Sequence, residues 1–342
     1  MRSVKKQPDI FTEAEWADIK AKHYIHELGY VSNLSLDYGR VIGSGLLAVR
    51  ENADAYGRRV IDAIIDLCDR YKRLAVEQDR RDVVEVLSRV PRYGATNFRE
   101  ALQMFRILHY ALWLEGDYHN TVGRFDQYIY PYFKLDMDAG VYTKETALDL
   151  LEDFFLSFNK DSDLYVGVQQ GDNGQSMVLG GRLEDGSEGF NELSELCLLA
   201  SRDLKLIDPK INLRVSKATP LEIYEKGTEL TKVGLGFPQY SNDDVVIEGL
   251  QKLGYDYKDA VNYVVAACWE FIIPNVGNDI ANIGAVNFPK LVDEVLRRDL
   301  PAGKDWNTLL ADVKAAIQAE CDRITESIHD VWFVPSPFLD LL

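Results

Sequence analysis

The residues best suited to chemistry are a thiol and a carboxylate in the segment VVAACWEF, residues 264–271. The apolar run before them predicts a buried strand, in which alternate side chains point to the same face. Cys268 and Glu270 would then share a face, although a carboxylate is costly to bury without a partner or a purpose. A neighbouring negative charge disfavours a thiolate nucleophile of the protease or disulfide-exchange kind. The pair suits a thiol that exchanges a hydrogen atom beside a base; a cysteine that only packs is the other interpretation.

Composition and charge narrow the class of protein. The 342 residues include 38 basic and 55 acidic side chains, a net charge of −17, which disfavours nucleic acid and anionic membranes as partners. No run of 18 uncharged apolar residues predicts a membrane span, and the first 20 residues lack a secretory signal. We therefore expect a soluble, cytoplasmic protein. The four cysteines and five histidines show no metal-binding spacing, so no metal site is predicted.

The hydrophobic periodicity predicts helices that alternate with short buried strands. Helical patterns cover residues 37–77, 97–116, 143–160, 190–203 and 219–236, and strands are predicted within 169–181, 210–216 and 264–271. The segments around residues 117–124 and 237–244 are predicted as loops. This alternation indicates an α/β fold with strands buried on both faces. The apolar segment WFVPSPFLDLL, residues 332–342, is expected to lack a cover.

Four segments carry a resemblance to a known family. They are GRFDQYIYPYF at 123–133, KINLRVSKATP at 210–220, GLGFPQYSNDDVVIEGL at 234–250 and AACWEFIIPNVGNDIANIGAVNFPK at 266–290. In this order and spacing they closely resemble the glycyl radical enzymes, the pyruvate formate-lyase-like family, from about residue 30 to residue 342. The resemblance implies part of a ten-stranded α/β barrel with peripheral helices, and a cysteine on a loop inside it. In such enzymes a glycine radical on a separate C-terminal domain oxidises that cysteine to a thiyl.

The resemblance also implies roles for individual residues. Cys268 matches the thiyl position, and Glu270 matches the general base or acid of the C-x-E branch, which holds the choline, glycerol, propanediol, hydroxyproline, isethionate and arylacetate-type enzymes. Ala267 stands where formate acetyltransferase has a second cysteine, which disfavours acetyl transfer. The substrate-binding positions implied by alignment are His119, Asn120, Asn282 and Asn33.

The radical glycine itself has no convincing match. The family's R-V-x-G-Y loop is absent, and RVIGSG at 40–45 lies in a helical stretch. We therefore interpret residues 1–342 as a single partial barrel domain without the glycyl radical domain, inactive alone, of an anaerobic lyase, dehydratase or decarboxylase. The alternatives are a barrel subunit of a split enzyme, a formate acetyltransferase-type activity, and a non-catalytic binding module.

Cofactor and partner expectations follow from the same resemblance. No cofactor is expected on this chain, because a radical S-adenosylmethionine activating enzyme would install the glycyl radical on the missing domain. The expected partners are a small hydroxylated or amino substrate, that activating enzyme, a chain carrying the glycyl domain, and a second copy in a homodimer.

Overall fold

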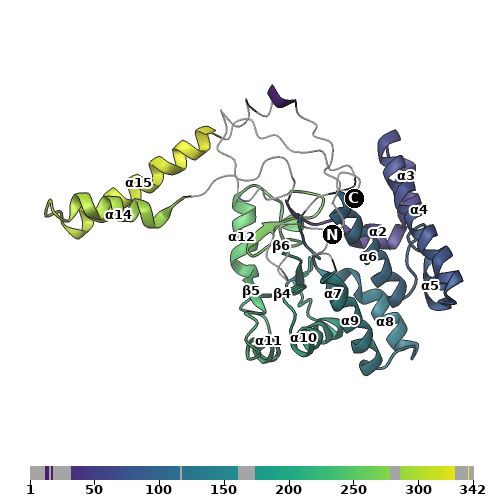
Figure 1. Ribbon diagram of the computed structural model, residues 1–342. Helices are drawn as coiled ribbons and strands as arrows, with labels where there is room; N and C mark the ends of the chain where they lie inside the picture. The colour runs from purple at the N-terminus through teal and green to yellow at the C-terminus, as the bar shows by residue number, and fades with distance from the viewer. Residues whose placement is uncertain are drawn as a thin grey trace. The chain divides into compact units, whose positions relative to one another are not determined.

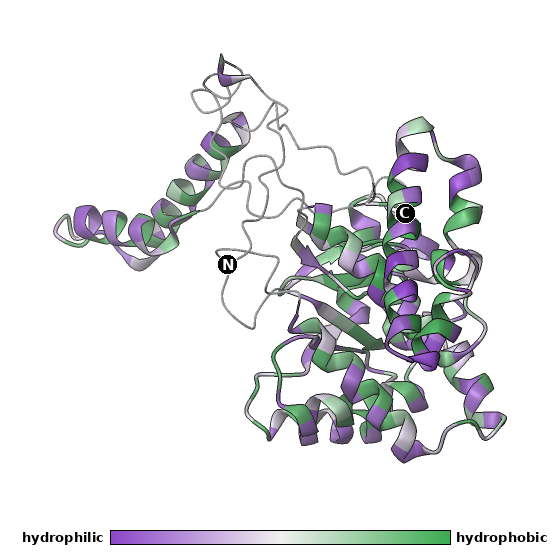
Figure 2. Ribbon diagram, turned by 45° about the vertical axis from the view of Figure 1, so that its right-hand side comes forward, coloured by the Kyte–Doolittle hydropathy of each residue, from purple (hydrophilic) through white to green (hydrophobic). Residues whose placement is uncertain are grey.

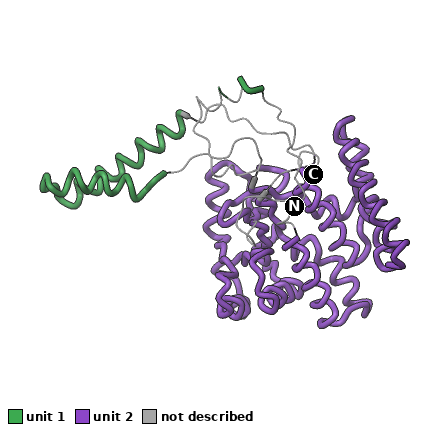
Figure 3. The backbone as a smooth tube through the Cα atoms, in the orientation of Figure 1, with its two compact units in different colours: residues 1–30, 280–334 green, residues 31–279, 335–342 purple. Residues whose placement is uncertain are grey.

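A computed structural model describes residues 12–14, 17, 32–115, 118–160, 174–277, 286–327 and 338. The chain divides into two compact units (Figure 3). Unit 1 comprises residues 1–30 and 280–334, and unit 2 comprises residues 31–279 and 335–342. Each unit is described by itself below.

Five helices follow the first strand of unit 2. Its helices are α2 (Tyr38–Ser44), α3 (Leu46–Asn52), α4 (Ala55–Glu77), α5 (Arg81–Leu87) and α6 (Phe98–Glu115). The helical pattern predicted over residues 37–77 is confirmed, but it is broken into three helices. Gly45 ends α2 with a φ of 81°, and the Asp54 carboxylate accepts a hydrogen bond from Gly57 N to begin α4. Positive φ is accessible to glycine without steric cost, so the break follows the sequence.

Further helices of unit 2 alternate with its strands. They are α7 (Phe125–Tyr128), α8 (Tyr130–Asp138), α9 (Lys144–Phe158), α10 (Glu192–Leu204), α11 (Leu221–Thr231), α12 (Asp243–Lys252) and α13 (Tyr257–Ala260). Figure 1 shows α9, α10 and α11 side by side next to the strands, and contacts join α9 to α10 and α10 to α11. Helix α9 begins with a capping box in which Thr143 and Thr146 bond reciprocally, which supports the predicted start near residue 143.

Five short strands in the described part of unit 2 run parallel. They are β1 (Ser32–Leu34), β2 (Tyr118–Asn120), β3 (Ser176–Gly180), β4 (Lys210–Val215) and β5 (Gln239–Asn242). β1 pairs with β2, and β3, β4 and β5 pair in that order. A parallel bridge between Gly123 and Met177 continues β2 to β3, so the strands form one wall. β3 and β4 are confirmed, whereas β1, β2 and β5 lie in or beside segments for which no strand was predicted.

The two faces of this wall differ in chemistry. One face packs against helices, and its β3 and β4 side chains belong to the main hydrophobic core: Met177, Leu179, Ile211, Leu213 and Val215. The opposite face of β4 carries Lys210, Asn212 and Arg214, all buried. Figure 2 shows both hydrophobic and hydrophilic colours on the strands. The polar alternation on the other face is therefore the unusual feature of the fold.

The apolar end of the chain is only partly described. The side chain of Phe338 is 1% exposed and belongs to the main core, and its backbone N–H donates to the Glu115 carboxylate. The expectation that this end lacks a cover is therefore wrong for Phe338. Its aromatic ring is held by the same core that packs the helices of unit 2.

Unit 1 contributes two described helices that contact each other, α14 (Phe288–Asp299) and α15 (Trp306–Ser327). The segment before α14 includes Asn282, which lies outside the described residues. No described helix is both long and apolar enough to cross a membrane.

Candidate active site

The predicted cysteine-bearing strand is a hairpin. β6 (Val264–Ala266) runs antiparallel to β7 (Glu270–Ile272), and residues 267–269 form the turn between them. Ala267 has a φ of 46°, in the left-handed region that interrupts an extended strand. The prediction of one continuous strand over 264–271 is therefore wrong. The buried Val264–Ala266 segment is a strand as predicted, but the backbone reverses immediately after it.

The turn presents the thiol and binds the carboxylate. Cys268 is exposed, and Glu270 Oε2 accepts hydrogen bonds from the backbone N–H of Cys268 at 2.9 Å and of Trp269 at 2.8 Å. Oε1 of Glu270 makes no hydrogen bond within the described residues. The Glu270 carboxylate thus uses one oxygen to bind the turn and leaves the other oxygen without a described partner. The thiol and the carboxylate are close because of the turn, and not because alternate residues of one strand share a face.

A lysine that the sequence analysis missed contacts the thiol. Lys210 is the first residue of β4, and its Nζ lies 3.9 Å from Cys268 Sγ. The thiol therefore has a cationic neighbour as well as the anionic Glu270. The sequence analysis considered only Glu270 as a charged neighbour of the thiol. Fifty-eight residues separate Lys210 from Cys268, and no local pattern in the sequence connects them.

Hydroxyl groups on the wall hold the arms of the hairpin. Ser176 Oγ donates to the carbonyl of Ala267 at 2.7 Å. Thr121 Oγ1 lies 2.6 Å from the carbonyl oxygens of both Val265 and Ser176, so it joins β6 to the wall. These contacts place the tip of the hairpin at the amino ends of β3 and β4.

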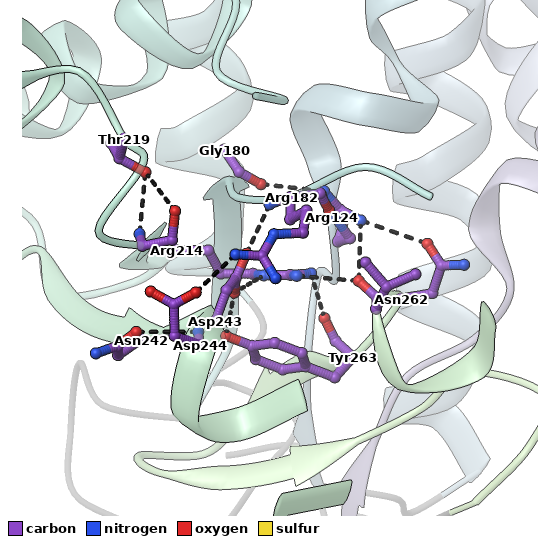
Figure 4. Close-up of polar contacts among 12 residues, drawn as sticks. Arg124, Gly180, Arg182, Arg214, Thr219, Asn242, Asp243, Asp244, Asn262 and Tyr263 are labelled. Carbon is purple, nitrogen blue, oxygen red and sulfur yellow. Dashed lines mark hydrogen bonds and ion pairs between the residues drawn. The ribbon is translucent and has the colours of Figure 1, made fainter. Parts of the chain in front are cut away.

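The base of the hairpin is fixed by buried charges at the carboxyl ends of the strands (Figure 4). Arg214, which is fully buried, donates from Nε to Asp243 at 2.8 Å and from its two other nitrogens to the carbonyls of Tyr263 and Val261, each at 3.0 Å. Its guanidinium carbon also lies 3.9 Å from the Tyr263 ring centroid. The Tyr263 hydroxyl donates to the same Asp243 oxygen at 2.7 Å.

A second arginine strengthens this base. Arg124 donates to the carbonyls of Val261, Gly180 and Arg182 at 3.1–3.3 Å. Burial and the neighbouring Arg214 lower the pKa of Arg124 to about 10, which leaves it cationic at neutral pH. The carboxyl ends of the strands therefore hold a hydrogen-bonded ionic network, the kind of arrangement in which buried charge is tolerated.

At the amino ends, two of the predicted binding residues meet. His119 Nδ1 lies 3.2 Å from Asn33 Oδ1, across 86 residues of sequence, and both residues have positive φ. The amide nitrogen of Asn33 is buried without a partner in the described part of the chain. Asn120 follows His119 and is fully buried in β2, opposite Leu34.

A buried hydrogen-bond chain supports the same ends of the strands. The Tyr38 hydroxyl lies 2.7 Å from His109 Nδ1, His109 Nε2 lies 2.8 Å from Gln175 Oε1, and Gln175 Nε2 donates to Asp208 at 3.2 Å. Burial, with Arg106 nearby, lowers the pKa of His109 to about 3, so its imidazole is neutral at physiological pH. His109 therefore positions the residues that precede β3 and β4.

A cavity of about 640 Å³ opens at the other end of the wall. Its lining includes residues that follow β1, β2 and β3, among them Asp37, Arg124 and Glu184, and it includes none of Cys268, Lys210, Asn33 or His119. We place the candidate site at the hairpin tip because the cavity has no thiol. Among the described residues no group of three or more His, Cys, Asp or Glu side chains is arranged to bind a metal ion.

Comparison with known proteins decides the family. A family model described as pyruvate formate lyase-like matches residues 12–313. The chain belongs to the pyruvate formate-lyase-like family. The fold and the C-x-E hairpin described above are thus those of a member of this family, and the resemblance inferred from the sequence is confirmed.

Individual relatives of this pyruvate formate-lyase-like chain are distant in sequence. It is 26% identical to the (2S)-3-sulfopropanediol dehydratase of Klebsiella oxytoca, over 87% of this chain and 42% of the relative. It is 29% identical to the 4-hydroxyphenylacetate decarboxylase glycyl radical subunit of Clostridioides difficile, over 58% of this chain and 23% of the relative. The chain therefore spans less than half the length of these two relatives.

A solved structure confirms the fold. The enzyme of 1,2-propanediol dehydration in Roseburia inulinivorans superposes with a TM-score of 0.77 at 23% identity, covering 91% of this chain and 46% of the other. The predicted fold class, part of the α/β barrel of glycyl radical enzymes, is confirmed. The parallel strands β1–β5 and the helices around them are consistent with part of such a barrel.

Proposed function

We propose that this chain supplies the reactive thiol of a glycyl radical lyase, a dehydratase, decarboxylase or related eliminating enzyme that acts on a small hydroxylated or amino substrate. The observation that carries the proposal is the exposed Cys268 at the tip of a hairpin whose base is fixed, with Glu270 two residues away. Family membership and relatives named as a dehydratase and a decarboxylase support it.

In this proposal Cys268 exchanges hydrogen atoms with the substrate. As a thiyl it takes a hydrogen atom from a substrate carbon, so that an S–H bond forms and a carbon radical remains; after the elimination it returns a hydrogen atom to the product radical. Glu270 moves the proton of the substrate hydroxyl through Oε1, which no described residue binds. A glycyl radical, installed by a radical S-adenosylmethionine activating enzyme, supplies the one-electron oxidation of the thiol.

The polar residues at the amino ends bind the substrate in the same proposal. Asn33 and His119 are joined by a hydrogen bond, and the buried Asn33 amide nitrogen is available as a donor. Asn120 and Asn282 are further binding candidates from the resemblance. In this proposal residues 1–342 act as one barrel domain together with the domain that carries the radical glycine, in an anaerobic cytoplasm. A homodimer of the completed enzyme is compatible with the proposal.

Reconstitution tests this function. The chain would be combined with the glycyl-radical polypeptide and its activating enzyme without oxygen, and small diols, amino alcohols and hydroxy acids would be screened for elimination. Cys268→Ala is expected to retain the glycyl radical EPR signal and to lose turnover. Glu270→Gln is expected to slow elimination by roughly 10²–10⁴-fold, the usual contribution of a positioned base. Cys321→Ala is the matched control, and turnover by Cys268→Ala would refute the proposal.

A further inference from the structure

Four buried polar atoms on two adjacent strands have no hydrogen-bond partner among the described residues. They are Asn212 Nδ2 and Oδ1 on β4, and Gln239 Oε1 and Ser241 Oγ on β5. Asn212 is fully buried, and Ser241 is 2% exposed. Buried amides and hydroxyls are normally hydrogen-bonded, because an unmet polar group costs free energy. This group of atoms is therefore suited to bind something that the described part of the chain does not supply.

The strand register places the three side chains together. In the parallel pair β4–β5, Asn212 is in register with Gln239, and Arg214 is in register with Ser241. Register partners on adjacent strands point to the same face of a sheet, and so do residues two positions apart along one strand. The side chains of Asn212, Gln239 and Ser241 therefore lie on one face, at neighbouring positions of two strands.

This face of the wall is the one that carries the hairpin. Val178 of β3, the register partner of Asn212, packs in the same hydrophobic cluster as Val265 of β6. Lys210, two residues before Asn212 on β4, approaches the sulfur of Cys268 to 3.9 Å. Two residues of an extended strand span roughly 6.6 Å, so Asn212 lies about that far along β4 from the residue that contacts the thiol. The polar group therefore borders the candidate site.

The atoms of this group favour a neutral ligand. Two amide oxygens accept hydrogen bonds, the Asn212 amide nitrogen donates them, and the Ser241 hydroxyl can do either. The charge of Arg214, the next residue on this face of β4, is already paired with Asp243. An excess of acceptors over donors disfavours an anion. A hydroxyl group both donates and accepts hydrogen bonds, so it matches this mixed set of atoms.

We infer that Asn212, Gln239 and Ser241 form a subsite that binds hydroxyl groups of the substrate beyond its reacting carbon. The inference rests on the proposed function, because it assumes that the reacting molecule meets Cys268. The substrate class is then a neutral polyhydroxylated compound, a linear polyol or a related sugar-like molecule. Its reacting carbon lies at the thiol, and its remaining hydroxyl groups extend along β4 and β5. Ordered water is the competing occupant, since water also satisfies buried amides.

Protection of Cys268 from alkylation tests this inference without radical chemistry. The rate of iodoacetamide labelling would be measured on the full chain, by mass spectrometry of the peptide that contains Cys268, with erythritol, xylitol or sorbitol present. Cys68 and Cys197 are buried, and Cys321→Ser removes the half-buried remaining thiol. At least one of these polyols is expected to slow the labelling in a saturable way. 1,2-Pentanediol has the carbon chain of xylitol but fewer hydroxyl groups, and roughly tenfold more of it should be needed for equal protection.

Asn212→Leu separates a ligand subsite from a structural amide. The variant removes both unpartnered amide atoms at similar volume, so it is expected to weaken polyol protection roughly tenfold or more. Its melting temperature should equal or exceed that of the wild type, because no hydrogen bond between described residues is lost. Asn52→Leu, at an exposed asparagine that ends α3, is the matched control and should leave protection unchanged.

Ser241→Ala keeps the inference testable if the leucine variant fails to fold. It removes one hydroxyl group at a buried position and is expected to weaken polyol protection roughly threefold. The labelling rate without polyol should stay at the wild-type value in this variant, because the serine does not contact the thiol. The same measurement on Gln239→Leu should show a loss of similar size.

Three results would overturn the inference. Labelling of the wild type that no polyol slows would mean that no hydroxylated ligand binds beside the thiol. Equal protection in the wild type and in folded Asn212→Leu and Ser241→Ala variants would place the polyol elsewhere. A marked loss of stability in Asn212→Leu with protection unchanged would show that the amide holds ordered water as part of the fold.

Failure of the proposed function gives a different pattern. Polyol protection that depends on Asn212, together with no turnover of any polyol by the reconstituted enzyme, would refute the radical chemistry and leave the subsite intact. Turnover that is unaffected by Asn212→Leu would have the opposite meaning, because the chemistry would then stand without the subsite.

Discussion

The two ends of the parallel wall use polar side chains in opposite ways. At the carboxyl ends, Arg214, Asp243 and Tyr263 form a buried network that fixes the base of the hairpin. At the amino ends, the exposed Cys268 lies close to Lys210, and Asn212 has two buried polar atoms that find no partner among the described residues. Buried polar groups whose hydrogen bonds are all made keep the structure rigid, whereas buried polar groups without partners are suited to bind a ligand. The difference indicates that one end of the wall is built for stability and the other for chemistry.

The largest effect is expected from breaking the network at the base. Arg214→Met leaves the Asp243 carboxylate buried without its cation, and such a loss costs about 3–5 kcal/mol of unfolding free energy. Urea unfolding followed by circular dichroism would measure it. Arg202→Met, which breaks an exposed pair with Asp203, is the control and should cost less than about 1 kcal/mol. If both variants lost the same small amount of unfolding free energy, the buried network at the base would be no more stabilising than an exposed ion pair.

The amino ends should respond to acid through His109. Its folded pKa of about 3 is depressed, so its contribution to stability is present above the unfolded pKa, near 6.5, and is lost as the pH falls from about 6.5 to 3. Relative to His109→Gln, the wild type should lose up to about 1.4 kcal/mol per pH unit in this window. Urea midpoints at pH 7, 6, 5 and 4 would show it. Parallel curves for the two proteins would contradict the prediction.

A smaller effect is expected where the tip joins the wall. Ser176→Ala removes the hydrogen bond to the Ala267 carbonyl and should cost about 1 kcal/mol, the net worth of one buried hydrogen bond. The midpoint of urea unfolding reports the cost. Ser187→Ala removes an exposed turn contact to Asp185 and should change stability by less than about 0.5 kcal/mol. If both serines proved equivalent, the hydroxyl contacts would not be what positions the tip.

The smallest effect on stability is expected from removing the Cys268 thiol. Cys268→Ala should change the unfolding free energy by less than about 0.5 kcal/mol, because the side chain is exposed. Cys197→Ala, at a fully buried position, should cost about 1 kcal/mol or more because it leaves a cavity. Thermal melts of the two variants provide the comparison. A marked destabilisation by Cys268→Ala would mean that the tip contributes to folding after all.

Parts of this molecule follow from the sequence and parts do not. β4 was predictable because Ile211, Leu213 and Val215 alternate toward an apolar core. The strands SNL, YHN and QYSN were missed because they are short and carry few of the β-branched or apolar residues on which strand prediction depends. Two of the missed strands, β1 and β2, carry the predicted binding residues Asn33, His119 and Asn120.

The candidate site divides in the same way. Cys268 and Glu270 were found because they are adjacent in the chain. The hairpin was missed because the reversal depends on the left-handed backbone of Ala267, which the residue type does not predict. Lys210 was missed because only the tertiary fold brings β4 to the tip. Contacts between distant segments are the part of a site that a single sequence does not specify.

The contacts along the hairpin also set the position of the thiol at its tip. From Tyr263 at the base to Ala267 at the turn, the chain spans four residue steps, roughly 13 Å at strand spacing. Arg214 holds this arm at Tyr263, and Thr121 and Ser176 hold it at Val265 and Ala267, so all three contacts determine where the sulfur lies. The position of the Cys268 thiol therefore depends on residues that do not contact it, such as Arg214. A substitution at the carboxyl ends of the strands that preserves folding could still shift the position of the Cys268 thiol and so slow the proposed reaction.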